Sequence, residues 1–134
     1  MTTRPSTTKQ ALVVDDDTAL LSLVRQWLAG DGYTVVACSA FETAKAHLRG
    51  AVPDVLLTDV RLGAFNGLQL VILAKEREPQ TVALVTSGFD HAALRKEALQ
   101  CGAAYLPKPF TRDQVLAAVH AAAVSGSEPA SAIS

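Results

Sequence analysis

The feature of the sequence that most restricts its fold is a series of five short apolar runs. Their starts are separated by roughly 20 to 27 residues, enough for one strand, one helix and two short connections. Within each run the apolar residues are continuous rather than alternating, as in parallel strands covered on both faces. We therefore predict five buried parallel strands, at Leu12–Val14, Val35–Ala37, Val55–Leu57, Val82–Val85 and Ala103–Leu106.

The segments between these runs have the patterns and boundary signals of helices. In the first segment, five apolar residues between positions 20 and 28 fall on one helical face, and Asp31–Gly32 ends that helix as a turn. The fifth helix is expected to run to about Val124. Two capping boxes and three single capping residues predict where the helices start. These signals are Asp16 or Asp17, Ser39–Glu42, Asn66, Asp90 and Thr111–Gln114.

Alternating strands and helices predict an α/β fold, a (βα)5 unit with right-handed crossovers. A chain of 134 residues is too short for a closed eight-unit barrel, which needs about 200 residues or more. We therefore expect an open, doubly wound five-stranded parallel sheet with strand order 2-1-3-4-5. The folded domain is predicted to span residues 9–124, with flexible segments at 1–8 and 125–134.

Composition narrows the range of functions. Lys and Arg number 12 against 13 Asp and Glu, and aromatic residues make up 5%. Neither the charge nor the aromatic content favours direct nucleic-acid binding. No apolar run approaches the roughly 18 residues needed to span a bilayer, so no membrane association is expected. Cys38 and Cys101 lie among apolar residues, which favours free thiols in a reducing cytoplasm and leaves a single disulfide open.

Polar residues that could do chemistry follow the predicted strands at one end. Asp15 and Asp16 follow the first strand, Asp59 the third, Thr86 lies at the end of the fourth, and Lys108 follows the fifth. In open α/β sheets, sites form outside the carboxyl ends of the strands where the strand order reverses. For this order, that point lies between the first and third strands. Alone, each residue has an ordinary role as a cap, turn or surface charge; their coincidence favours a site.

Crowded carboxylates need a cation, or one of them must take up a proton. Mg²⁺ suits such a cluster, because it binds carboxylate, carbonyl and phosphoryl oxygens. Lys108 and Thr86 would supply a positive charge and a hydrogen bond to a phosphoryl group. A carboxylate can itself act as the nucleophile and form an acyl phosphate. The pattern therefore predicts phosphoryl chemistry.

The same residues resemble the receiver domain of two-component response regulators, over about Lys9 to Val124. The resemblance implies a flavodoxin-like fold. Each matching segment is weak alone, but their order and spacing are specific. The segments are Leu12–Asp17, Asp54–Asp59, Asn66–Gly67, Val85–Ser87 and Tyr105–Phe110.

The resemblance also implies roles for individual residues. Asp59 matches the aspartate that accepts phosphate from a histidine kinase or a histidine phosphotransfer protein. The ligands of Mg²⁺, for which Mn²⁺ can substitute, are matched by Asp15, Asp16, Asp59 and the backbone carbonyl of Arg61. Thr86 matches the hydroxyl that moves onto the phosphoryl group, and Lys108 matches the lysine that contacts it.

Further matches concern the switch and the loop after the acceptor. Tyr105 matches the aromatic switch residue, and the Lys108–Pro109 bond matches one that is cis in the family. The chain departs from the family pattern at Gly63, where many relatives have proline, so the loop after the acceptor is expected to be more mobile. Arg61 and Gly88 lie at variable positions that tune phosphate lifetime, which leaves that lifetime unpredicted.

The function implied is a phosphoacceptor switch rather than a turnover enzyme. Its partners would be the phosphodonor and an unidentified downstream protein bound by the fourth helix, fifth strand and fifth helix. The domain would be a monomer or a phosphorylation-dependent dimer, either standing alone or forming part of a longer protein. Two alternatives are a receiver-like scaffold and a haloacid-dehalogenase-type phosphatase. The phosphatase motif fails because Ala19 occupies the place of its Thr or Val.

Overall fold

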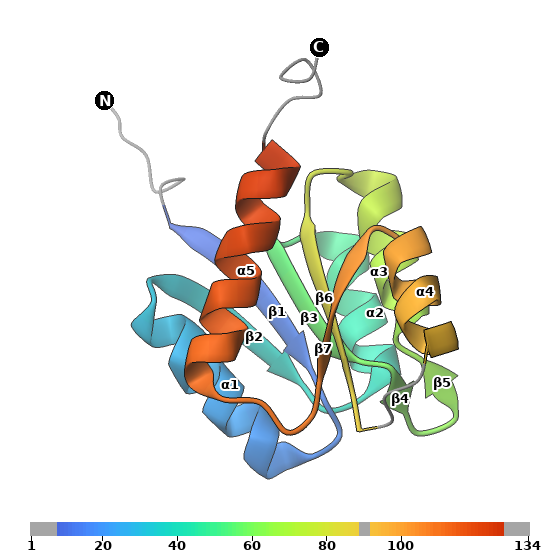
Figure 1. Cartoon of the computed structure of the whole chain (residues 1–134), viewed down its shortest axis with the longest axis horizontal. Coiled ribbons are helices and arrows are strands. Elements are labelled where there is room, and N and C mark those ends of the chain that lie inside the picture. Colours follow the sequence, from blue (N-terminus) through green and yellow to red (C-terminus); the bar gives the residue numbers. More distant parts are fainter. Residues whose placement is uncertain (1–7, 89–91, 128–134) are drawn as a thin grey trace.

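A five-stranded parallel sheet forms the centre of the molecule (Figure 1). The computed structural model describes residues 8–88 and 92–127. The strand order is β2-β1-β3-β6-β7, which confirms the predicted 2-1-3-4-5 arrangement and the α/β class. The strands are β1 (Lys9–Val14), β2 (Tyr33–Cys38), β3 (Val55–Asp59), β6 (Val82–Ser87) and β7 (Ala103–Pro107).

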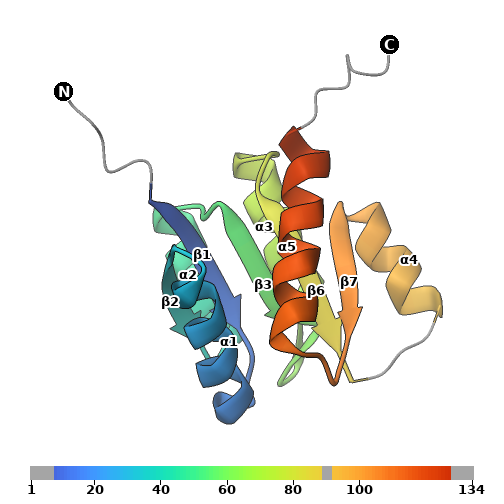
Figure 2. The ribbon, with the colours of Figure 1, turned by 60° about the vertical axis from the view of Figure 1, so that its left-hand side comes forward.

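Helices cover both faces of this sheet (Figure 2). Alternate residues of each strand face opposite sides, so Leu12 and Val14 pack with α2, α3 and α4, while Ala11 and Val13 pack with α1 and α5. Every residue of β3 and of β6 is buried, which explains their continuous apolar sequence. The helices are α1 (Thr18–Gly30), α2 (Phe41–Gly50), α3 (Leu68–Arg77), α4 (Ala92–Gln100) and α5 (Arg112–Ser127).

Two of the predicted helix starts have the expected capping bonds. The Asp17 carboxylate accepts hydrogen bonds from the backbone N–H groups of Ala19 and Leu20, at 3.1 and 3.2 Å. Thr111 and Gln114 form the reciprocal bonds of a capping box, at 2.8 and 3.2 Å. Both signals therefore correctly predict the first turns of α1 and α5.

The other predicted helix boundaries agree less well with the structure. The capping box expected at Ser39–Glu42 is wrong: the N-cap of α2 is Ala40, without a side-chain cap bond, so Ser39 lies one residue too early. The cap expected at Asn66 also lies one residue too early, because the N-cap of α3 is Gly67, without a side-chain cap bond. The Asn66 side chain still accepts a hydrogen bond from the Leu68 N–H at 2.8 Å. Asp90 lies outside the described residues. Helix α5 continues to Ser127, so residues 125–127 of the expected C-terminal segment are helical.

A small antiparallel hairpin links β3 to α3, and the sequence patterns do not predict it. Its strands are β4 (Arg61–Leu62) and β5 (Phe65–Asn66), joined through Gly63 and Ala64. Gly63 has φ of +64°, and no other type of residue in the described chain has positive φ. A positive φ at the first of two loop residues is what a type II′ hairpin turn requires, and glycine adopts it without strain. The segment expected to be a loop is thus a hairpin, and its mobility stays a prediction.

Two smaller predictions can also be compared with the structure. Cys38 and Cys101 are free thiols, so they form no disulfide with each other. None of the described helices has the length and apolar character needed to cross a membrane.

The Asp17 cap generates a stability prediction. Asp17→Ala removes the acceptor for two backbone N–H groups, so we expect the free energy of unfolding to fall by about 1 kcal/mol. Urea denaturation measures this change. Asp17→Asn is the matched control, because asparagine keeps the accepting oxygen and should retain most of the stability. Equal losses in both variants would contradict the capping role.

Candidate functional site

The carboxyl ends of four strands bring the predicted site residues together at one edge of the sheet. Asp15 follows β1, Asp59 ends β3, Thr86 lies in β6 and Lys108 follows β7. Strands β1 and β3 are paired neighbours, and Asp59 is the register partner of Thr86. The position expected from strand order, between the first and third strands, is where the acidic residues lie.

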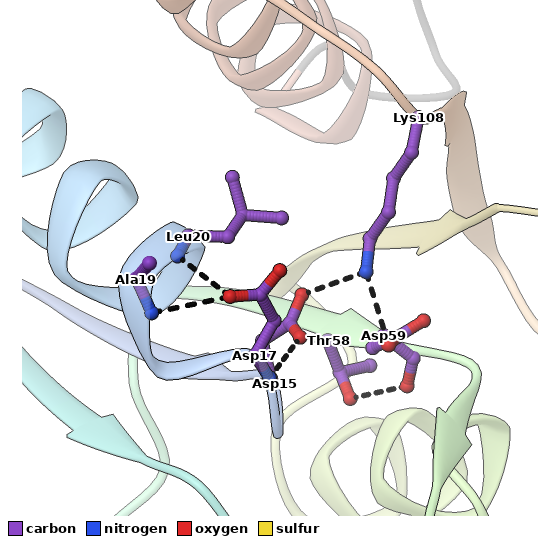
Figure 3. A network of polar contacts seen from close by, with 7 residues as sticks. All are labelled: Asp15, Asp17, Ala19, Leu20, Thr58, Asp59 and Lys108. Carbon is purple, nitrogen blue, oxygen red and sulfur yellow. Dashed lines mark hydrogen bonds and ion pairs between the residues drawn. The ribbon is translucent and has the colours of Figure 1, made fainter.

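The Lys108 ammonium connects two of the carboxylates (Figure 3). Its Nζ atom lies 3.0 Å from Asp15 Oδ2 and 3.1 Å from Asp59 Oδ2. The side chain of Lys108 is 21% exposed, and those of its two partners are 4% and 9% exposed. The other oxygen of Asp15 accepts a hydrogen bond from the Asp17 N–H at 2.9 Å. Lys108 therefore joins the ends of β1, β3 and β7 through charge-assisted bonds, which are shielded from water.

Three carboxylates converge beside this lysine. One oxygen from each of Asp15, Asp16 and Asp59 lies within 4.8 Å of the other two. Asp15 and Asp59 are buried, whereas Asp16 is exposed to solvent. Such a set fits Mg²⁺, which takes a few carboxylate oxygens and keeps several water ligands on its open side. Asp15, Asp16 and Asp59 are therefore the residues that could hold a divalent cation.

The electrostatic environment raises the pKa of Asp59. Burial is the main cause, and the negative charge of Asp15 adds to it. The charge and hydrogen bond of Lys108 and a backbone hydrogen bond from Arg61 lower the pKa in part. Burial alone would lower the pKa of Lys108, but its bonds and charge interactions with Asp15 and Asp59 raise it overall. The lysine thus stays charged beside a carboxylate that is costly to ionise.

Thr86 has an unusual environment for a polar side chain. It is 0% exposed, and its Oγ1 atom has no hydrogen-bond partner among the described residues. A buried hydroxyl without a partner costs about 1–3 kcal/mol. The Thr86 hydroxyl could therefore donate a hydrogen bond to an acceptor atom placed beside Asp59, its register partner in β3.

Tyr105 and Pro109 extend the site along β7. The Tyr105 ring is partly buried, and the Arg95 guanidinium lies 5.1 Å from its centroid, within the range of a cation–π contact. The Lys108–Pro109 bond is cis, as the resemblance implies. The backbone N–H of Lys108 donates to the Ser87 carbonyl at 2.8 Å, which ties the turn after β7 to the end of β6.

Thr58 and Gly67 lie against the backbone of Asp59, and the sequence patterns predict no role for either. The buried Thr58 hydroxyl donates a hydrogen bond to the Asp59 carbonyl at 2.9 Å. A Cβ at Gly67 would lie 2.0 Å from that same carbonyl oxygen and 2.7 Å from Thr58 Oγ1. The Gly67 N–H also donates to the Val60 carbonyl at 2.7 Å. The only sequence signal is the Asn66–Gly67 pair, which forms part of the resemblance.

A family model for the response regulator receiver domain matches residues 11–120, which include all of these site residues. The chain belongs to the response regulator receiver family. The domain is therefore a signalling domain, and its family implies phosphoacceptor signalling.

Curated relatives match the receiver domain over only part of their length. The DNA-binding transcriptional regulator NtrC of Salmonella typhimurium is 37% identical over 114 residues, covering 82% of this chain and 24% of that protein. The acid tolerance regulatory protein ActR of Sinorhizobium medicae is 31% identical over 112 residues, covering 83% of this chain and 58% of that protein. The chain thus spans about a quarter of NtrC.

Solved structures agree on the fold. A CheY-like receiver domain protein from Methanospirillum hungatei superposes with a TM-score of 0.81 at 26% identity, covering 88% of this chain and 95% of the other. The beryllofluoride-activated NtrC4 receiver domain dimer gives 0.80 at 25% identity, covering 88% of this chain and 98% of the other. Both comparisons support the flavodoxin-like architecture.

The raised pKa of Asp59 predicts a pH-dependent effect on stability. The folded protein holds a proton on Asp59 more tightly than the unfolded chain does. The stabilisation from this difference is therefore fully present at pH values below the pKa of Asp59 in the unfolded chain, about 3.9. That contribution is lost as the pH rises through the folded pKa. We therefore expect Asp59→Asn to raise the free energy of unfolding at pH 7 without divalent cations, and to change it less near pH 4. Urea denaturation at both pH values tests this.

Asp113→Asn is the control, because that side chain is 90% exposed and should show no comparable pH dependence. Lower stability of Asp59→Asn than of the wild type at pH 7 would contradict the electrostatic account.

The close approach of Gly67 predicts a separate loss of stability. In Gly67→Ala the new methyl group would overlap the Asp59 carbonyl, so the start of α3 or the acceptor backbone must shift. Overpacking of this kind costs about 1–3 kcal/mol, which chemical denaturation can measure. Gly30→Ala, with nothing within 4 Å of the added Cβ, should leave stability unchanged or improve it. A neutral Gly67→Ala would refute the steric argument.

Proposed function

We propose that this domain, spanning residues 9–124, is a phosphoacceptor switch in which Asp59 takes a phosphoryl group from a histidine kinase or a histidine phosphotransfer protein. The observation that carries the proposal is the convergence of three carboxylates and the Lys108 ammonium at one sheet edge. In a cluster with only a structural role, we would expect each charged group to have a partner of opposite charge. Here Asp16 is exposed to solvent and the pKa of Asp59 is raised. Perturbed titratable groups of this kind are typical of reacting sites.

The transfer is a displacement at phosphorus. An oxygen of the Asp59 carboxylate attacks the phosphorus in line, forming the oxygen–phosphorus bond of an acyl phosphate. The phosphorus–nitrogen bond of the donor phosphohistidine breaks, and the imidazole nitrogen keeps the bonding electron pair. Bound Mg²⁺, or Mn²⁺ in its place, would neutralise charge on the phosphoryl oxygens.

The protein contributes position and charge to this step. Asp15, Asp16, Asp59 and the Arg61 carbonyl would hold the cation. Lys108, already 3.1 Å from Asp59 Oδ2, would contact a phosphoryl oxygen. A fixed cation beside the reacting carboxylate favours its ionised, nucleophilic form and stabilises developing negative charge.

The switch would begin at Thr86. A phosphoryl group on Asp59 brings acceptor oxygens toward the hydroxyl that has no partner among the described residues. Movement of Thr86 would change the space available to Tyr105 in the neighbouring strand β7. The surface formed by α4, β7 and α5 would then change its affinity for a downstream protein.

The oligomeric state and cellular context follow from the same proposal. The domain is a monomer or becomes a dimer on phosphorylation; a relative, NtrC4, has a beryllofluoride-activated receiver dimer. We place the domain in the cytoplasm, where it acts through protein contacts rather than by contacting DNA itself. NtrC is named as DNA-binding, but this chain covers only 24% of that protein. The domain assists its own phosphorylation and dephosphorylation without being a turnover enzyme.

The proposed function predicts stoichiometric labelling. Incubation with a small acyl phosphate should phosphorylate the protein in the presence of Mg²⁺, and removal of Mg²⁺ with a chelator should abolish the reaction. Asp59→Asn should remove the label, because the amide is not a comparable nucleophile. Intact-mass spectrometry detects the added phosphoryl group.

Asp113→Asn makes the same chemical change at an exposed residue and should leave labelling intact. Undiminished labelling of Asp59→Asn would sink the acceptor assignment. Multiple-turnover release of phosphate from monoesters would instead favour a phosphatase, and a wild-type protein that neither binds Mg²⁺ nor becomes labelled would favour a scaffold.

A further inference from the structure

The β4–β5 hairpin leads directly away from the acceptor. Its strands contain only two residues each, with Arg61 paired to Asn66 and Leu62 paired to Phe65. Two such strands have few backbone bonds and little stability of their own. Contacts with the rest of the domain must therefore fix the position of the hairpin.

The first anchor of the hairpin is apolar packing in the core. Leu62 is buried in the cluster that contains residues of α2, α3 and α4, and the preceding Val60 is buried in the same cluster. The backbone N–H of Gly67 donates to the Val60 carbonyl. These contacts hold the two ends of the hairpin. Phe65, the register partner of Leu62, projects from the same face of the hairpin as Leu62.

The second anchor of the hairpin is aromatic stacking. The Phe65 ring lies parallel to that of Phe41, with a centroid distance of 4.6 Å and an interplanar angle of 8°. Phe41 is buried at the first turn of α2, whereas Phe65 is 44% exposed. A fixed ring in the core thus supports an exposed ring on the hairpin. Stacking contributes interaction energy beyond the area that the rings bury.

The hairpin also touches the acceptor. Arg61, the first residue of β4, makes a backbone hydrogen bond to the Asp59 side chain. Phe65 is the register partner of Leu62, the residue next to Arg61. A shift of Phe65 across this two-residue ladder would therefore move the Arg61 peptide relative to Asp59.

We propose that the Phe41–Phe65 stack is a positioning element that fixes the Arg61 backbone beside Asp59 and the divalent-cation site. The inference rests on the proposed function in one respect, the use of the Arg61 carbonyl as a cation ligand. Phe65 is the positioning residue, since its apolar ring offers no ligand atom to a cation. It acts through the β4–β5 ladder and the Arg61 peptide.

The test uses the full chain, unphosphorylated, with Mg²⁺ as the only ligand. Isothermal titration calorimetry should show Mg²⁺ binding weakened about 2- to 10-fold in Phe65→Ala, the range that corresponds to loss of one aromatic pair. Phe65→Leu, which keeps apolar bulk without a ring, should also bind more weakly. Phe65→Tyr should restore wild-type affinity, because it keeps the ring.

Leu99→Ala is the matched control, since Leu99 is a 69% exposed apolar side chain on α4 and outside the hairpin. It should leave Mg²⁺ affinity unchanged. Wild-type affinity in Phe65→Ala would overturn the proposal, as would equal weakening in Phe65→Ala and Phe65→Tyr.

Hydrogen exchange supplies a readout that does not depend on the cation. In Phe65→Ala the backbone amides of residues 61–66 should exchange faster, while those of β1 and β3 keep their protection. Unchanged exchange at 61–66, or an equal increase throughout the sheet, would refute a local positioning role. Loss of the stack leaves Asp59 in place, so continued labelling of Phe65→Ala, at a higher Mg²⁺ requirement, separates this proposal from the acceptor assignment itself.

Discussion

The repulsion between carboxylates at one end of the sheet is the constraint on which the rest of the site depends. The strand order places Asp15 and Asp59 on paired strands, and their oxygens lie close enough to share one cation. Lys108 offsets part of this repulsion from β7, which is separated from β3 by β6. The lysine can do so because parallel strands end at the same edge, so the turn after β7 faces the acidic cluster. The strand order thus determines which charges lie close together at the site.

Much of the architecture could be predicted because its signals are local or periodic. Continuous apolar runs correspond to strands such as β3 and β6, in which every residue is buried. Asp17 and the Thr111–Gln114 pair identify helix starts because a capping bond spans only two or three residues. Ser39 shows the limit of this reasoning. It has the spacing of a capping box, but α2 begins one residue too late for its side chain to occupy the N-cap position.

The unpredicted parts arise from contacts between residues far apart in the sequence. Phe41 and Phe65 show no shared pattern, and their stacking depends on how α2 packs beside the hairpin. The Arg77 guanidinium donates to the carbonyls of Leu48 and Arg49 at 2.6 and 2.7 Å, so one helix satisfies the C-terminal end of another. Gly67 lacks a side chain because the Asp59 carbonyl occupies that space. Each contact requires the tertiary structure to be known first.

Two features of the site lower the stability of the fold, and the surrounding core must compensate for them. Thr86 keeps a buried hydroxyl without a partner among the described residues, and the pKa of Asp59 is raised mainly by burial. Both features oppose folding, yet they lie side by side at the ends of two fully buried strands. A phosphoryl group on Asp59 would give the Thr86 hydroxyl an acceptor, while a bound cation would offset the negative charge. Phosphorylation and cation binding together would thus relieve both local costs, which would bias the equilibrium toward the phosphorylated state.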